Sequence, residues 1–352
     1  MDYKKYLFAP DKQRTPYWKQ VWKFGKIFIY TFFIITFLWG CGQMFDPNVS
    51  TSGKTTGAGS IFGTYFELLF PGDDSKTHFI NGEEELPFNG ISSWDEAWTV
   101  TKSPFFGLFV YPIAALLWVL LKGFSGGIAA EPTAAAAIGA MFVTALIIKL
   151  ITLAFSWKSQ KNQEKMQAIQ LKQGEIQAKY KGSADPQARQ KMQLELMGLY
   201  KKEGVKPLAS FANLFLSMPF LYAMFMVVRS MRILKEQEFG AISFTITPWE
   251  GLKAGDWAYL AIVFVYLPIQ IISMLLPMYL NRAKKKAFTK ESKAAQKKQL
   301  ITQLIMTGVF MLLVFTIGSG VAIYWIFSGA LQIGQTVLFH YINKNAKYKK
   351  KK

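Results

Sequence analysis

Several stretches of nearly twenty apolar residues occur in this sequence, and no other feature limits its fold so strongly. A helix of about 20 apolar residues matches the hydrocarbon thickness of a bilayer, whereas a soluble domain has no need of such runs. The sequence therefore predicts an all-α polytopic membrane protein. The predicted spans are 27–45, 133–156, 208–228, 257–280, 299–317 and 320–342.

The charges between these runs are asymmetric. The chain carries a formal net charge of +19. Four segments are basic, with seven Lys/Arg in 1–26, eleven in 157–207, eight in 281–298 and six lysines in 343–352. Segment 46–102 instead holds nine Asp/Glu against three Lys. Because basic loops stay on the cytoplasmic side of a membrane, both termini are predicted to be cytoplasmic and 46–102 to lie outside.

A seventh apolar stretch, 104–121, is assigned by the same rule. If it crossed the membrane, the basic segment 157–207 would fall outside, so it is predicted not to span. It would lie in the outer interface or pack on the bundle, with Pro112 breaking any long straight helix. Residues 104–132 are then an interfacial helix with its linker, after the extracytoplasmic loop 46–103, whose Gly, Ser, Thr and Asn content indicates a small or poorly ordered excursion.

Segment 157–207 has the pattern of two amphipathic helices joined by a turn at 181–186. The apolar stripes are narrow, which predicts a cytoplasmic helical hairpin and not a domain core. Its methionines Met166, Met192 and Met197 have flexible apolar side chains that could contact varied hydrophobic clients. Packing of the two helices against each other is the alternative explanation of the same stripes.

Lys149 stands inside the apolar run 138–155. A charged side chain at membrane depth costs at least about 2.5–3.5 kcal/mol, so such residues normally face a bundle interior or a wet cavity. Roughly 10 Å of helix separates Lys149 from the basic segment that starts at Lys158, which is a long way to reach the headgroups. A functional intramembrane cation is therefore predicted, with extension of the side chain to the interface as the alternative.

Cysteine and histidine are scarce. One cysteine, Cys41, and two distant histidines exclude a disulfide framework and do not favour a metal centre. No phosphate-binding GxxxxGK[ST] loop occurs and no spanning segment contains Asp or Glu, so neither a cofactor nor an enzyme is expected. Cys41 follows Leu38-Trp-Gly, a loose likeness to a lipoprotein cleavage site, and lipidation there is the alternative to an intact first span.

Three motifs then carry a family resemblance. The segments MQLELMGLYKKEGVKP at 192–207 and LSMPFLY at 216–222 resemble the pre-membrane motif of the YidC-type membrane protein insertases. The hairpin GSGVAIYW at 318–325 is similar to the family's glycine, aliphatic and tyrosine-aromatic signature, and the stretch around FVYP at 109–112 to its outer interfacial helix. The resemblance covers roughly 104–345.

This resemblance implies a five-helix insertase core at 133–342, preceded by one N-terminal transmembrane helix within 1–45 and carrying the cytoplasmic hairpin. The family's core forms a groove open to the cytoplasm and to lipid, made hydrophilic by an arginine. By position Lys149 replaces that arginine, with Thr152 on the same helical face. Gln270, Tyr324 and Trp325 match other groove positions, although glutamine can also join helices and the aromatics can be interfacial anchors.

The implied function is insertion of client transmembrane segments into a bacterial cell membrane, alone or with the Sec translocon. Its partners would be nascent membrane proteins and membrane lipids. The basic tail 343–352 could add the ribosome, or could simply bind anionic lipid. The alternative from the residues alone is a small-solute or anion transporter that uses Lys149 as a binding site, although no inverted repeat is visible.

Overall fold

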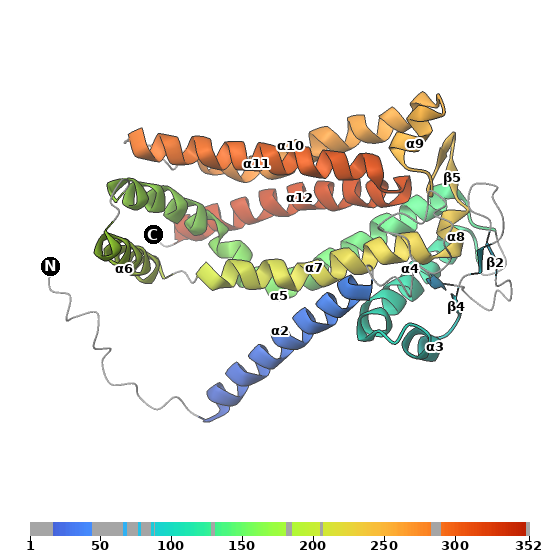
Figure 1. The fold of residues 1–352 in the computed structure, drawn as a ribbon, viewed down its shortest axis with the longest axis horizontal. Helices are drawn as coiled ribbons and strands as arrows, with labels where there is room; N and C mark the ends of the chain where they lie inside the picture. The colour runs from blue at the N-terminus through green and yellow to red at the C-terminus, as the bar shows by residue number, and fades with distance from the viewer. Residues whose placement is uncertain are drawn as a thin grey trace.

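Five long helices run side by side and form the body of the molecule (Figure 1). They are α5 (Ala134–Lys179), α7 (Pro207–Ser230), α10 (Leu260–Arg282), α11 (Lys290–Thr316) and α12 (Ser319–Lys349). The computed structural model describes residues 17–43, 66–68, 77–78, 86–87, 89–127, 131–180, 185–204, 207–282 and 290–349. Within these ranges α12 packs against α10 and α5, while α7 and α11 also pack against α5.

The remaining elements are shorter or lie at the edges of this body. The other helices are α2 (Tyr17–Gln43), α3 (Trp94–Thr99), η2 (Phe106–Val110), α4 (Tyr111–Phe124), α6 (Pro186–Glu203), α8 (Arg232–Lys235), α9 (Pro248–Lys253) and η3 (Trp257–Tyr259). The strands are β1 (Phe66–Leu68), β2 (Thr77–His78), β3 (Leu86–Pro87), β4 (Asn89–Ile91), β5 (Glu238–Phe239) and β6 (Ile242–Ser243).

The predicted all-α polytopic architecture is confirmed. By length and composition, four helical stretches of the described chain can cross a membrane: Phe106–Phe124, Ala134–Ala154, Trp257–Pro277 and Ser319–Asn345. Shorter apolar helical stretches at Ile27–Gly40, Met218–Ser230 and Leu300–Thr316 coincide with the other three predicted spans. Phe106–Phe124 is the stretch that was not predicted to span. It is long and apolar enough to cross a membrane, so its exclusion as a span rests on the charge pattern alone.

The two ends of the helical body differ. The hairpin end comprises α6, the last turns of α5 and the last turns of α12, and the start of α2 points the same way (Figure 1). The strand end comprises β2, β4, β5, α8 and α9 at the opposite side of the picture. All the predicted cytoplasmic segments that the structure describes therefore share one end.

The hairpin differs from the prediction of two separate helices within 157–207. Its first helix is a direct continuation of the membrane span, because α5 runs unbroken for 46 residues from Ala134 to Lys179. Residues beyond Phe155 change from apolar to Lys, Gln, Glu and Ala, which alters their solvation but preserves strong helix propensity. The return helix α6 begins at Pro186, with Asp185 as its N-cap, and ends at Gly204 in the left-handed conformation.

The stretch at 104–121 also differs in detail. Pro112 does not end a helix but lies at the start of α4, directly after the π-helical turn. The π-helical turn η2 leads directly into it, so Phe106–Phe124 is one continuous helical stretch. Its α4 portion packs against α5 and α7, with Ile113, Leu117 and Leu121 buried. Of the two predicted arrangements, the structure therefore shows packing on the bundle.

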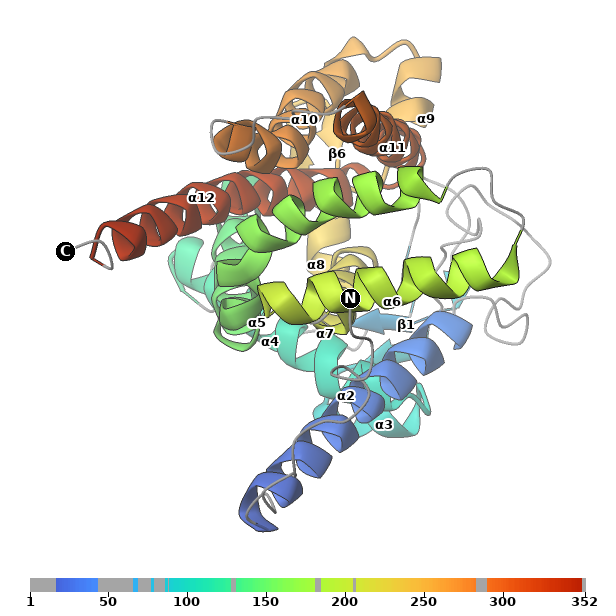
Figure 2. The same cartoon turned by 90° about the vertical axis from the view of Figure 1, so that its left-hand side faces the viewer.

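Helix α2 is attached to the body through its second half only. Phe33 meets Phe109 edge to face at 5.2 Å, and Phe37 meets Tyr222 at 5.7 Å. The Tyr222 hydroxyl donates to the carbonyl of Gly40 at 3.2 Å. The first half of α2 stands clear of the other helices in both views (Figures 1 and 2). Side chains there, such as Phe24 and Phe28, are exposed, as expected for a helix that faces lipid.

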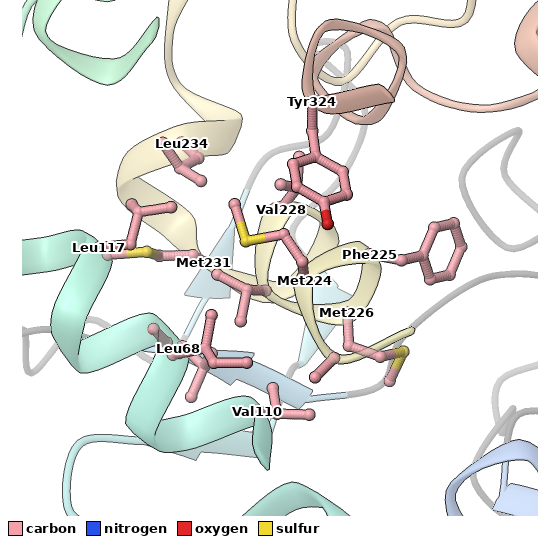
Figure 3. Close-up of a cluster of buried hydrophobic side chains, with 14 of the residues drawn as sticks. Leu68, Val110, Leu117, Met224, Phe225, Met226, Val228, Met231, Leu234 and Tyr324 are labelled. Carbon is pink, nitrogen blue, oxygen red and sulfur yellow. The ribbon is translucent and has the colours of Figure 1, made fainter. Parts of the chain in front are cut away.

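The acidic loop expected to be a small excursion contributes to the core. Strand β1 pairs in parallel with β4, and Leu68 forms a further bridge to Met231 at the end of α7. Leu68 and Ile91 are 1% and 0% exposed. Figure 3 shows Leu68 among Val110, Leu117 and Met231. This part of the loop therefore closes the strand end of the main hydrophobic cluster.

A tight turn joins the predicted spans 299–317 and 320–342, since α11 ends at Thr316 and α12 begins at Ser319. The backbone N–H of Ser319 donates to Ile246 and that of Gly320 to Phe244, both at 3.0 Å. A Cβ on Gly318 would lie only 3.1 Å from the carbonyl oxygens of Phe244 and Thr245. A larger residue would therefore crowd this position, because the turn packs directly on the backbone that follows β6.

Candidate functional site

Helices α5 and α12 lie alongside each other in the same direction and in register. Three contacts follow one another along the pair. Phe142 meets Phe327 with ring centroids 5.4 Å apart, Lys149 meets Gln332, and Trp157 meets Phe339 at 4.9 Å. The two aromatic pairs lie about 10–12 Å on either side of Lys149, at 1.5 Å per residue. The middle contact is therefore held between two packed layers.

Lys149 is half-buried on α5 and reaches across to α12. Its Nζ donates a hydrogen bond to Oε1 of Gln332, with a nitrogen–oxygen distance of 2.5 Å. No carboxylate of the described chain forms an ion pair with it. An amide orients an ammonium group but does not neutralise it. Lys149 therefore reaches towards α12 and has no counter-ion among the described residues.

Gln332 is the site residue that the sequence analysis missed. It belongs to a polar stripe on α12, which we call the α12 stripe, at helical spacings of three, four and seven residues. The stripe consists of Ser328, Gln332, Gln335, Thr336 and Asn343. Two amides, Gln332 and Gln335, inside the apolar stretch Ser319–Asn345 were the available signal. The Oε1 atom of Gln335 is buried without a hydrogen-bond partner in the part of the chain that is described.

Thr152 and Thr144 flank Lys149 on α5 but do not reach it. The hydroxyl of Thr152 donates back to its own helix, to the carbonyls of Ile148 and Lys149 at 3.0 Å each. Thr144 is fully buried, and its hydroxyl oxygen has no partner among the described residues. Neither threonine is brought to the ammonium group, so a groove role for Thr152 stays a prediction.

Gln270 lies on α10 in a separate polar contact. Its amide nitrogen approaches the sulfur of Met274 at 3.6 Å, and the hydroxyl of Thr307 on α11 donates to the same sulfur at 2.9 Å. The contact between Thr307 and Met274 links α11 to α10, whereas the contact of Gln270 stays within α10, so a groove role for Gln270 stays a prediction. No hydrogen bond joins Gln270 to Lys149 within the described ranges.

Tyr324 and Trp325 are placed in packed surroundings, about 12 Å or less along α12 from Gln332. Tyr324 is 3% exposed, and Figure 3 shows its ring pointing into the cluster around Met224 and Phe225. Trp325 packs against Phe310 at 5.8 Å and Tyr266 at 6.3 Å, and its ring N–H is buried without a partner that the structure describes. Both residues line the helix interfaces around the site and do not contact Lys149.

Two ion pairs connect the helices of the hairpin. Lys172 bonds Glu203 at 2.6 Å and Lys179 bonds Glu195 at 3.1 Å, all near the surface. The Glu195 carboxylate accepts a hydrogen bond from Lys179 and raises the pKa of that lysine. Tyr200 adds a hydrogen bond to Gln173 at 3.1 Å. These polar contacts hold the two helices side by side, and the role of their methionines in client contact stays a prediction.

The candidate client-contacting residues of the hairpin are exposed to different degrees. Met197 is 63% exposed, and Met192 is half-buried. Met166 lies in α5, with its side chain outside the described set. Cys41 lies in α2, likewise with its side chain outside that set. Cleavage before Cys41 would remove Phe33, Phe37 and Gly40, which attach α2 to the body, but lipidation itself stays a prediction.

Comparisons with known proteins agree with this architecture. A family model described as the 60Kd inner membrane protein matches residues 131–348, from the start of α5 to the end of α12. Over 363 residues the chain is 41% identical to membrane protein insertase YidC of Mycoplasma capricolum, covering 96% of this chain and 94% of that protein. Over 334 residues it is 31% identical to the same-named protein of Ureaplasma parvum, covering 91% and 83%. The chain belongs to the YidC family of membrane protein insertases.

Proposed function

We propose that this protein inserts client transmembrane segments into the cell membrane, with Lys149 as the cation that attracts their acidic flanks. One observation carries the role of Lys149. Its ammonium group faces the bundle interior and is held by a neutral amide, so its charge remains available to a client. The relatives named insertases support insertion over the transporter that an intramembrane lysine alone would allow.

The energetic problem of insertion is the polar flank that has to cross the hydrocarbon. A polar path between α5 and α12 shortens the apolar distance, and a positive charge within it stabilises acidic residues during passage. The apolar part of the client then leaves sideways into lipid, a transfer worth about 25 cal/mol per Å² of apolar surface removed from water. The α12 stripe supports such a path because it continues from the level of Lys149 to the hairpin end. No bound cofactor is needed for these steps.

The orientation that fits this function puts the hairpin end in the cytoplasm and the strand end outside. The described parts of the basic segments 157–207 and 343–352 belong to the hairpin end, and the described parts of the acidic segment 46–102 to the strand end, which supports the positive-inside assignment. Both termini are then cytoplasmic. The acidic client flank would enter from the hairpin end, travel along the α12 stripe and leave past the strand end.

The partners follow from the same orientation. Nascent membrane proteins are the clients, and lipid receives them. The lysine-rich tail 343–352 is suited to the phosphates of ribosomal RNA or of anionic lipid, both through salt-sensitive and sequence-independent attraction. Cooperation with the Sec translocon belongs to the same proposal. The exposed Met197 on α6 is a contact point for apolar clients arriving at the hairpin.

Reconstituted vesicles test the proposal. The client is a single-span protein whose translocated tail carries Asp residues, and its matched control carries Asn at the same positions. Insertion is scored by protease protection of the tail. Wild-type protein and Lys149→Arg should insert the Asp client well, while Lys149→Ala and especially Lys149→Glu should lose it. Normal insertion of the Asp client by Lys149→Glu would contradict the role of Lys149, and no insertion of either client by wild type would contradict the function.

A further inference from the structure

The contact between Lys149 and Gln332 joins residues 183 positions apart in the sequence, and it is the polar contact recorded for the ammonium group. Gln332 is half-buried, and its backbone carbonyl accepts a hydrogen bond from the Thr336 hydroxyl at 2.9 Å. The aromatic pairs Phe142–Phe327 and Trp157–Phe339 pack α5 to α12 on both sides of it. The separation of the two polar side chains is thus set by packed helices and not by the side chains themselves.

An amide group is chemically suited to this position. Lysine places a compact charge with three donors on a flexible four-carbon stem, so it needs a partner to fix its direction. A carboxylate at position 332 would fix it but cancel its charge, and an aliphatic residue would leave a partly buried donor unsatisfied. The carbonyl oxygen of glutamine orients the ammonium, while its amide group keeps two N–H donors of its own.

These donors have no acceptor yet. Within the described ranges, the Gln332 amide nitrogen donates no hydrogen bond, and the Lys149 ammonium uses one of its three donors on Gln332. An incoming carboxylate could therefore accept one bond from Lys149 Nζ and one from Gln332 Nε2. Charge-assisted hydrogen bonds of this kind are about twice as strong as neutral ones, and two donors on different helices add directional selectivity.

We propose that Gln332 is a positioning and specificity-determining residue, which holds the Lys149 ammonium toward α12 and donates to the same client carboxylate. Gln332 and Lys149 together form a two-donor clip for Asp or Glu side chains in the translocated flank. This inference rests on the proposed function, since it assigns the second half of the same binding site. It explains how a lysine, with its flexible stem, can serve where the family resemblance implies an arginine with a rigid donor fork.

The experiment measures charge preference, defined as the insertion rate of the Asp client divided by that of the Asn client, in vesicles containing the full-length protein. Gln332→Leu and the longer, unbranched Gln332→Met should lower the preference about tenfold, which equals about 1.4 kcal/mol. Gln332→Glu should abolish it by pairing with Lys149. Circular dichroism spectra in detergent that match the wild type show that the three variants are folded, and the Asn client, which offers no carboxylate, should lose less of its insertion rate than the Asp client.

Two comparisons separate positioning from a merely structural role. In a Lys149→Ala background, Gln332→Leu should cause no further loss, because a residue that acts through Lys149 is coupled to it. Gln303→Leu makes the same chemical change on α11, where the buried side-chain oxygen has no partner among the described residues, and should keep the preference. Additive losses in the double variant, or an unchanged preference in Gln332→Leu, would overturn the inference. A wild-type protein that inserts both clients equally would instead overturn the charge-based proposed function.

Discussion

The attachment of α2 to the helical body depends on the absence of a side chain at Gly40. A Cβ at this position would lie 2.6 Å from Cδ1 of Phe105, 2.8 Å from its Cγ and 3.1 Å from its Cβ. Rotation of the Phe105 ring cannot relieve the last of these distances. Rotation would also break the contacts of the Phe105 ring with the rings of Phe37 and Tyr222, whose centroids lie 6.4 and 5.2 Å away. Gly40→Val therefore forces α2 away from the body.

The expected cost combines two effects. Overpacking of a filled interface costs about 1–3 kcal/mol. The hydrogen bond from the Tyr222 hydroxyl to the Gly40 carbonyl contributes about 1 kcal/mol more when it is lost. A total of about 2–4 kcal/mol corresponds to a fall in the unfolding midpoint on the order of 3–5 °C, at about 2.1 cal/mol/K of unfolding entropy per residue.

Thermal unfolding in detergent, followed by circular dichroism, measures this difference. Gly42→Val is the matched control, because it lies two residues away in the same helix and a Cβ there has no atom within 4 Å. Both variants carry the same change in helix propensity, so their difference isolates the contact with Phe105. Equal midpoints for Gly40→Val and Gly42→Val would refute the close-approach argument.

Three further predictions concern the two ends of the molecule. Leu68→Ala should destabilise the fold by about 2–4 kcal/mol, because the side chain is 1% exposed in the main cluster, and a denaturation midpoint in detergent that stays unchanged would exclude this role. Lys172→Ala should lower the free energy of unfolding by less than about 1 kcal/mol, since its ion pair is exposed. A larger loss in the same denaturation experiment would show that this pair closes the hairpin. The Ser92 backbone N–H and hydroxyl donate to Glu96 at 2.6 and 2.8 Å and hold the pKa of Glu96 below its usual value of 4.5. This stabilisation of α3 is present above pH 4.5 and is lost as pH falls through the lowered pKa, so Glu96→Gln should flatten the pH dependence of amide exchange in α3, corrected for intrinsic rates. An identical pH dependence in wild type and variant would rule out this contribution.

The membrane-spanning helices could be predicted because their signal is local. Each span is marked by a run of apolar residues of about the length that a bilayer requires. The distribution of charges further predicted that the basic segments lie at the same end of the helical body. Lys149 was identifiable for the same reason, since a lysine inside an apolar run is anomalous without any knowledge of its neighbours.

The partner of Lys149 could not be predicted in the same way. It depends on the rotation and register of α5 against α12, which are set by contacts such as Trp157–Phe339 between distant segments. Gln332 was visible as an amide in an apolar stretch, but nothing local distinguishes it from Gln335 or Gln270. Tyr324 was expected near a groove from its motif, whereas its burial against Met224 follows from how α7 and α12 pack.

Because α5 is continuous, the first helix of the hairpin and the Lys149 site belong to one and the same helix. The distance from Lys149 to Lys179 is 30 residues of unbroken helix, or about 45 Å at 1.5 Å per residue. A force applied to the hairpin tip would therefore act on the helix that carries Lys149, whose ammonium group lies between the two aromatic pairs. The Trp157–Phe339 pair lies between the hairpin and Lys149 and packs this part of α5 against α12. A partner bound at the hairpin tip would therefore act through about 45 Å of continuous helix before reaching the site.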